Sequence, residues 1–220
     1  LHAVLAQAAT RAIRTRQPAL ASLVLSAPNY DPLQIFRAWQ RLYPGKCFYW
    51  EQPSRHMALI GGGTALSIQT KGSERFIQAA QLWQKLFATA TIQQASGLRD
   101  SAHGPVLFGG FSFDPLRPQT STLWQYFPAG LLILPRLLFS QRDNQTTLTL
   151  SHLVQPGDDP EQLANEISAQ VTQITQMLSM LNPLILAEGP AYATRDIWPA
   201  QAWQKLVGKT VRAIQHGDYA

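Results

Sequence analysis

Apolar residues recur at spacings of three and four in several stretches of the chain, which is the period of an amphipathic helix. The clearest stretch follows Asp159-Pro160, a capping residue and a proline in the order that begins a helix. Its predicted buried face consists of Leu163, Ile167, Val171, Ile174, Leu178 and Leu181. Further helices are expected over 1–16, 32–43, 73–94 and 199–216.

Two of these helices carry a long apolar stripe. The stripe of the helix over 73–94 consists of Phe76, Ala80, Trp83, Phe87 and Ala90. The stripe of the helix over 199–216 consists of Trp203, Val207, Val211 and Ile214. Asp31-Pro32 is expected to begin the helix over 32–43, and Gly217 to end the last one.

Shorter apolar runs bounded by Gly, Pro, Asn or Asp predict strands. They cover 20–26, 47–51, 57–60, 65–70, 104–115, 129–139 and 146–154. The run 104–115 has apolar residues on both faces, which is typical of a central strand covered from two sides. Gly109 and Gly110 in its middle predict a bulge or a close backbone contact.

The runs 129–139 and 146–154 are expected to form a hairpin with its turn at 142–144, and Pro135 to mark a bulge or an edge. The second run alternates, with Leu148, Leu150 and Val154 on one face and Thr147, Thr149 and Ser151 on the other. Strands that come as hairpins and meanders, with helices between the groups, predict an α+β fold with mainly antiparallel sheets flanked by helices.

Composition changes this picture in one respect. Hydrophobic residues make up 45% of the 220 residues, but charged residues only 14%, which is low for a fully solvated surface. We therefore expect part of the surface to be buried against something else. The net charge of +5 comes from scattered residues, and the one tight group, Arg11, Arg14 and Arg16, lacks interleaved aromatics, so no nucleic-acid partner is expected.

Cysteine usage and hydropathy narrow the class further. Cys47 is the only cysteine, which excludes an internal disulfide and a cysteine metal site, and its strand-like context predicts an inert thiol. No apolar run is long enough to span a membrane, and residues 1–16 lack a secretory segment. We expect a cytoplasmic protein without a membrane partner.

Each candidate for chemistry has an ordinary structural explanation. Gly61-Gly62-Gly63 lacks the ending of a phosphate loop and is expected to be a tight turn between strands. Ser112 does not complete a nucleophile elbow, because Asp114 stands where a glycine is needed. No two histidines have the spacing of a zinc box; they are His2, His56, His103, His152 and His216.

The acidic and aromatic clusters are also explained without catalysis. A helix start accounts for Asp158, Asp159, Glu161 and Glu166 through capping and the helix dipole. Phe48, Tyr49 and Trp50 are expected to be core residues rather than a stacking platform. The residues by themselves therefore predict no catalytic, cofactor-binding or metal-binding site.

Three stretches together resemble a known family. Residues 48–65 resemble the early F-Y-W-E-x-P … G-x-G-x-A block of isochorismate synthases, and Gly109–Pro115 matches their G-G-F-x-F-D-P strand. Residues 203–220 resemble the helix that precedes their catalytic strand. The order and spacing of the three stretches fit chorismate-utilising enzymes, which implies the chorismate-binding fold of large antiparallel sheets with helices outside.

The resemblance implies the conversion of chorismate to isochorismate with Mg²⁺ as cofactor. In that family a lysine base activates water to attack C2, a glutamic acid protonates the departing C4 hydroxyl, and glutamates hold Mg²⁺. These residues lie beyond the matched stretches, so none is assigned to this chain. We expect residues 1–220 to be the N-terminal portion of a single enzyme domain that is truncated before its catalytic half, and to be inactive alone.

Two alternatives stay open. One is another chorismate enzyme: anthranilate, aminodeoxychorismate or salicylate synthase. The first two often carry an L-L-E-S-type segment, and Leu23-Val24-Leu25-Ser26 lacks its acid. The other alternative is a non-catalytic α+β module.

Overall fold

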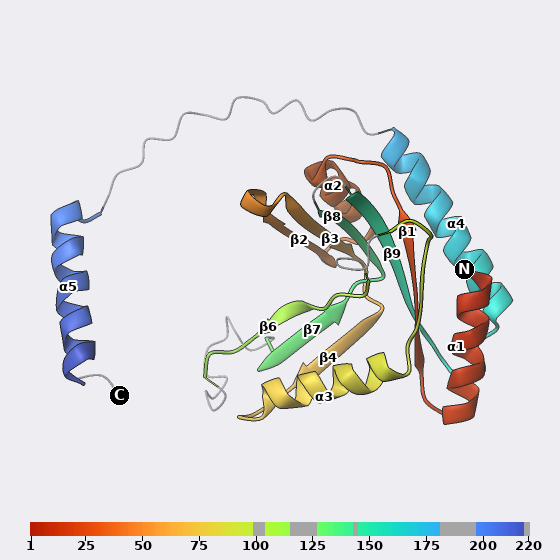
Figure 1. Cartoon of the computed structure of the whole chain (residues 1–220), viewed down its shortest axis with the longest axis horizontal. Coiled ribbons are helices and arrows are strands. Elements are labelled where there is room, and N and C mark those ends of the chain that lie inside the picture. Colours follow the sequence, from red (N-terminus) through yellow and green to blue (C-terminus); the bar gives the residue numbers. More distant parts are fainter. Residues whose placement is uncertain (99–103, 115–126, 143–144, 181–196, 218–220) are drawn as a thin grey trace. The chain divides into compact units, whose positions relative to one another are not determined.

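The computed structural model describes residues 1–98, 104–114, 127–142, 145–180 and 197–217. The chain divides into two compact units, Leu1–Pro183 and Leu184–Ala220, and each is described by itself. The first unit contains two sheets, and the second contains one described helix (Figure 1). The predicted α+β class with mainly antiparallel sheets is confirmed, since β1–β5 is the one parallel pair among the described strands.

The larger sheet has six strands in the order β2-β3-β8-β9-β1-β5. Their bounds are β1 Ala19–Ser26, β2 Cys47–Gln52, β3 Met57–Gly62, β5 Thr91–Gln94, β8 Leu137–Arg142 and β9 Gln145–Val154. The predicted β8–β9 hairpin is present, with Arg142 opposite Gln145. Residues 143–144 of its predicted turn lie outside the described residues.

Three helices pack on one face of this sheet and form the main core (Figure 1). They are α1 His2–Thr15, α2 Pro32–Leu42 and α4 Pro160–Ser179. The predicted caps are confirmed: Asp31 accepts hydrogen bonds from the backbone of Leu33 and Gln34, and Asp159 accepts one from Glu161. Trp39 of α2 is fully buried, and its indole donates to the Ile60 carbonyl at 3.3 Å.

The smaller sheet has three strands in the order β4-β7-β6, and α3 packs against β4 and β7. The bounds are β4 Leu66–Thr70, β6 Phe108–Phe111, β7 Gly130–Leu134 and α3 Arg75–Ala88, and a 3-10 turn η1 covers Pro53–Arg55. In the described part of the chain, the predicted strand 104–115 is only four residues long and lies at the edge of its sheet instead of the centre. Gly109 and Gly110 weaken strand formation, which agrees with the short length of β6.

The two sheets share one bent antiparallel ribbon. Pairing runs from Met57–Arg142 to Gly62–Leu137 in the larger sheet, and continues from Leu66–Leu134 to Thr70–Gly130 in the smaller one. At the bend, residues 63–65 face only Pro135 and Arg136, so one strand carries an extra residue, as in a β-bulge. The predicted single strand 129–139 is therefore two strands, β7 and β8, separated at Pro135, which bears out the predicted bulge.

The predicted helix over 73–94 is wrong at its end. The helix stops at Ala88, and Thr91–Gln94 form β5, which pairs in parallel with β1 from Ala21–Thr91 to Val24–Gln94. Pairing with a distant strand overrides the local helical pattern there. The apolar stripe of α3 is also largely exposed: Phe76 is 52% exposed and Phe87 44%, while Arg75 and Ala79 are buried.

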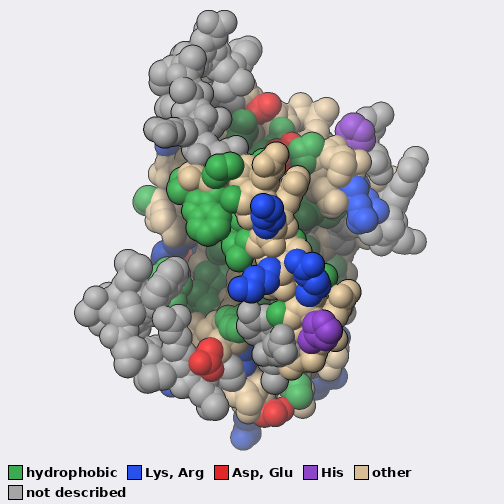
Figure 2. Space-filling model, turned by 90° about the vertical axis from the view of Figure 1, so that its left-hand side faces the viewer, with side chains coloured by type: hydrophobic (Ala, Val, Ile, Leu, Met, Phe, Trp, Pro, Cys, Tyr) green, Lys and Arg blue, Asp and Glu red, His purple; other side chains and the backbone are tan. Residues whose placement is uncertain are grey.

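The second unit contains α5 (Ala200–His216), which ends at Gly217 in a left-handed conformation as predicted. Its apolar stripe is exposed, with Trp203 at 59% and Ile214 at 58%. Figure 2 shows hydrophobic side chains, in green, and Lys and Arg side chains, in blue, at the surface of the described residues. No described helix is both long and apolar enough to cross a membrane.

Candidate functional site

The backbone of β6 has no room for a side chain at Gly109, where it pairs with β7. A Cβ atom at Gly109 would overlap the Leu131 carbonyl group of β7, whereas a Cβ at Gly110 would meet nothing within 4 Å. The predicted close backbone contact is therefore confirmed at the first glycine. The chain continues past β6, where the Ser112 amide donates to the Ala129 carbonyl at 2.8 Å.

A buried arginine fixes the chain that leaves β6. Arg75, the first residue of α3, is 4% exposed. Its Nη2 donates to the carbonyl oxygens of Ser112 at 2.8 Å and Phe113 at 3.3 Å, and its Nη1 donates to Gly72 at 3.2 Å. One guanidinium thus joins the start of α3 to two successive peptide groups. We call these contacts the Arg75 clamp.

The Arg75 clamp lies among aromatic rings. The guanidinium carbon is 4.5 Å from the centroid of Phe76, and that ring is 4.4 Å from Phe111 of β6. The position is costly, because a cation at a helix N-terminus opposes the helix dipole and the Arg75 Nε is buried without a hydrogen bond. A costly buried contact of this kind indicates that the path of the chain at 112–113 is tightly determined.

The clamped turn points one side chain into solvent. Phe113 is 103% exposed, although the carbonyl of the same residue is held by Arg75. Ser112 serves this turn as well, because its hydroxyl donates to the Asp114 carbonyl at 3.1 Å. The predicted structural reading of Ser112 agrees with this bond, although the residue lies just after the strand and not within it.

The triple glycine forms the end of a strand more than a turn. Gly61 and Gly62 belong to β3, and only Gly63, at φ +68°, makes the turn toward β4. A Cβ at Gly62 would lie 2.8 Å from the Trp39 ring, so this glycine lets α2 approach the sheet. The predicted turn between strands is therefore confirmed at Gly63 alone, and the two strands that it joins, β3 and β4, lie in different sheets.

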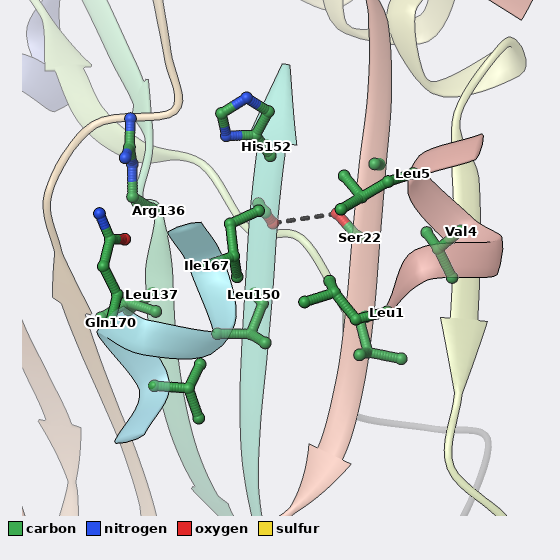
Figure 3. Close-up of a pocket in the computed structure, with 14 residues that line it drawn as sticks. Leu1, Val4, Leu5, Ser22, Arg136, Leu137, Leu150, His152, Ile167 and Gln170 are labelled. Atoms are coloured by element: carbon green, nitrogen blue, oxygen red, sulfur yellow. Dashed lines mark hydrogen bonds between the residues drawn. The ribbon is translucent and has the colours of Figure 1, made fainter. Parts of the chain in front are cut away.

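A small cavity lies between α1, α4 and the larger sheet (Figure 3). Its volume is about 20 Å³, enough for about one water molecule. Apolar residues such as Leu5, Leu150 and Ile167 line it, and Ser22 and Ser151 share a hydrogen bond of 2.9 Å beside it. It is far smaller than the roughly 300 Å³ and more of typical ligand pockets, so it cannot hold a substrate.

His152 and Arg136 lie together at this cavity (Figure 3). Burial lowers the pKa of His152, and the charge of Arg136 lowers it further, while Asp158 and Glu166 act in the opposite direction. The imidazole is therefore favoured in its neutral form. It is a candidate acceptor for a proton, but the cavity beside it leaves no room for a reactant.

The remaining candidates have structural partners. Cys47 donates to the Tyr43 carbonyl at 3.1 Å, and burial raises the pKa of its thiol, in agreement with the inert role predicted for it. Phe48 stacks on Phe108 at 5.2 Å, and Tyr49 packs on Phe36 at 5.5 Å, so these two aromatics are packed as predicted. Trp50 is 43% exposed and departs from that prediction.

The acidic residues accept hydrogen bonds in the loop after β9 and in the first turns of α4. Asp158 accepts a hydrogen bond from the Gln155 amide, and Glu166 accepts one from the Gln162 side chain at 2.9 Å. Within the described ranges, no three His, Cys, Asp or Glu side chains gather as metal ligands would. These residues therefore do not fit the expected Mg²⁺. His103 lies outside the described residues.

Sequence reasoning missed Arg75. A lone arginine at the start of a predicted helix is usually solvated, and nothing in its neighbours indicates that 37 residues later the chain returns to its guanidinium. Only the aromatic-glycine composition of 108–113 marks the partner segment.

The sequence is similar to two relatives that are named as isochorismate synthases. Over 144 residues, 64% of this chain, the sequence is 34% identical to "Isochorismate synthase MenF" of Bacillus subtilis. Over 206 residues, 92% of this chain, it is 30% identical to "Salicylate biosynthesis isochorismate synthase" of Pseudomonas aeruginosa. The chain spans only 30% and 40% of the length of these two relatives.

Among solved structures, the menaquinone-specific isochorismate synthase MenF of Escherichia coli aligns with a TM-score of 0.44 and 19% identity, covering 96% of this chain and 42% of that one. A family model described as "Chorismate binding enzyme" matches residues 5–220, nearly the whole sequence. The chain therefore belongs to the family of chorismate binding enzymes.

Proposed function

We propose that the protein is an isochorismate synthase that converts chorismate to isochorismate, and that residues 1–220 are the N-terminal part of its single enzyme domain. The observation that carries this proposal is the 30% identity over 206 residues to a relative named as an isochorismate synthase. The second named relative, at 34% identity, supports the same product. The substrate partner is then chorismate, and a cytoplasmic location follows from the same proposal.

The proposed reaction is an isomerisation in which water adds at C2 of chorismate and the C4 hydroxyl leaves as water. Atoms therefore balance without an oxidant or a second substrate. A base, an acid and Mg²⁺ are needed for it, as the resemblance implies. None of these roles is assigned to residues 1–220, whose part in the proposed enzyme is to supply sheets and helices on which the reactive half is built.

The names of the two relatives indicate different uses of one product. One is named MenF, a name shared with the menaquinone-specific enzyme of Escherichia coli, and the other is named for salicylate biosynthesis. Isochorismate precedes both quinones and salicylate-derived siderophores in chemical terms. We therefore make the proposal at the level of isochorismate, and a salicylate-forming enzyme is its nearest competitor.

The test is an assay of the full-length protein and of residues 1–220 with chorismate and Mg²⁺, with products separated by chromatography and identified by mass. We expect isochorismate from the full-length protein and no turnover from residues 1–220. Formation of anthranilate, aminodeoxychorismate or salicylate by the full-length protein would replace the proposed activity by another of the family. Turnover by residues 1–220 would refute the proposal that the catalytic residues lie outside them.

A further inference from the structure

We propose that Phe113, held in place by the Arg75 clamp, is the anchor through which this chain docks onto the remaining part of the same enzyme polypeptide. The inference rests on the proposed function only in assuming that residues 1–220 belong to a longer protein. It assigns an interaction surface to a segment that contributes no chemistry of its own.

The first argument is exposure. Phe113 is 103% exposed, and Phe76 of α3, which packs on Phe111 beside the clamp, is 52% exposed. Neighbouring large apolar side chains at a surface mark interaction sites, whereas single ones are ordinary. A phenylalanine that becomes buried removes on the order of 150–250 Å² from water, so Phe113 can contribute more than a smaller residue would.

Hydrogen bonds hold the backbone on both sides of Phe113. The Ser112 and Phe113 carbonyls accept from Arg75, the Ser112 amide donates to Ala129, and the Ser112 hydroxyl donates to Asp114. The backbone that carries the exposed ring is thus fixed at successive peptide groups. Because this backbone is already ordered, less conformational entropy is lost when the ring that it carries becomes buried.

The third argument concerns the occupant. The two relatives are much longer than this chain, which covers 30% and 40% of them. The clamped segment also continues β6, which lies at an edge of its sheet in the described part of the chain, and an edge strand can pair with an added strand. The occupant that fits is an apolar surface of the rest of the polypeptide, with a strand beside β6.

The test compares variants of the full-length protein by thermal unfolding. We expect Phe113→Ala to lower the melting temperature by about 3 °C or more, with Phe113→Leu intermediate, because the truncated ring leaves a cavity in the docked surface. Ile13→Ala, which truncates another exposed apolar side chain, 61% exposed on α1, is the control and is expected to change it by less than about 1 °C. Arg75→Gln combined with Phe113→Ala is expected to lower it by less than the sum of the single changes.

Unchanged melting of the Phe113→Ala protein would overturn the inference, since the ring would then remain in water. A protein that is oligomeric as wild type and becomes monomeric in Phe113→Ala, measured by sedimentation, would also overturn it by making a second copy the occupant. Chorismate turnover by the wild-type protein is measured separately. Its failure would reject the proposed function, while the melting comparison would still decide the docking.

Discussion

Polar side chains are buried on the face of β9 that lies opposite its core leucines. Thr147, Thr149 and Ser151 of β9 are at most 3% exposed, and Ser22 and Ser140 beside them are buried as well. The alternation of β9 was predicted correctly, but such alternation usually indicates a solvent-facing polar side. Sequence could not reveal that both faces are covered, because the covering residues come from other parts of the chain.

Residue chemistry was predictable where its cause is local. Asp31 and Asp159 stand directly before a proline and cap the helices that follow, as expected. Arg75 was not predictable, because its partners Ser112 and Phe113 are distant in sequence. The candidate site therefore lies largely outside what composition and spacing can show.

His152 gives the first prediction, the dependence of stability on pH. Because its pKa is lowered in the folded state, the unfolded chain binds a proton more readily below the ordinary value of about 6.5. The stabilisation is present above that pH and is lost as the pH falls. We expect the free energy of unfolding, measured with urea, to fall less between about pH 7 and pH 5 in His152→Gln than in the wild type.

The control for this experiment is His2→Gln, which changes an exposed histidine at the start of α1. Its unfolding free energy is expected to follow the wild-type pH dependence. If the unfolding free energy of His152→Gln and of the wild type changed equally with pH, the surroundings of His152 would not oppose protonation of its imidazole.

At the scale of elements, the sequence predicted most helices and strands and erred where pairing partners decide. The short run Thr91–Gln94 lies at the end of the predicted helix over 73–94, yet it pairs with β1 as a parallel strand. The run 129–139 was assigned to one strand, because nothing in its apolar composition indicates that Pro135 separates two sheets. The local sequence pattern predicts whether a segment is a helix or a strand more reliably than it predicts which strands pair with each other.

The pairing of β6 with β7 gives the second prediction. Gly109→Ala places a methyl group on the Leu131 carbonyl, so we expect it to lower the free energy of unfolding by about 1–3 kcal/mol. Gly110→Ala is the matched control, because its methyl group meets nothing within 4 Å, and it is expected to be neutral or slightly stabilising. Chemical denaturation of both variants checks this, and equal effects would contradict the close approach of the two strands.

At the scale of the whole molecule, the low content of charged residues and the exposed apolar side chains both indicate a surface that becomes buried against a partner. Charged residues are 14% of the sequence, and large apolar side chains are exposed on α3, at Phe113 and on α5. The sequence predicted that part of the surface is meant for burial, and it identified the family through motifs in three stretches. It could not identify which faces are open, because exposure depends on how the helices rotate against the sheets.

The third prediction is that purified residues 1–220 associate with themselves. Exposed apolar side chains and the edge of β6 favour contacts between copies. We expect light scattering to show a mean mass that rises with concentration, and a smaller rise when Phe76 and Phe113 are both changed to Ser. A monomer of 24.4 kDa at all concentrations would count against it.

The bend of the ribbon shared by both sheets has a consequence for insertions and deletions. Three residues on one side of the corner oppose two on the other. The number of residues at the corner therefore determines which side chains of β4 face the core and which face solvent. Loss of a single residue between Gly63 and Ala65 would turn Ile68 and Thr70 outward and Ser67 and Gln69 inward. Insertions or deletions at this corner should therefore be tolerated only when they change its length by two residues, which leaves the facing of β4 unchanged.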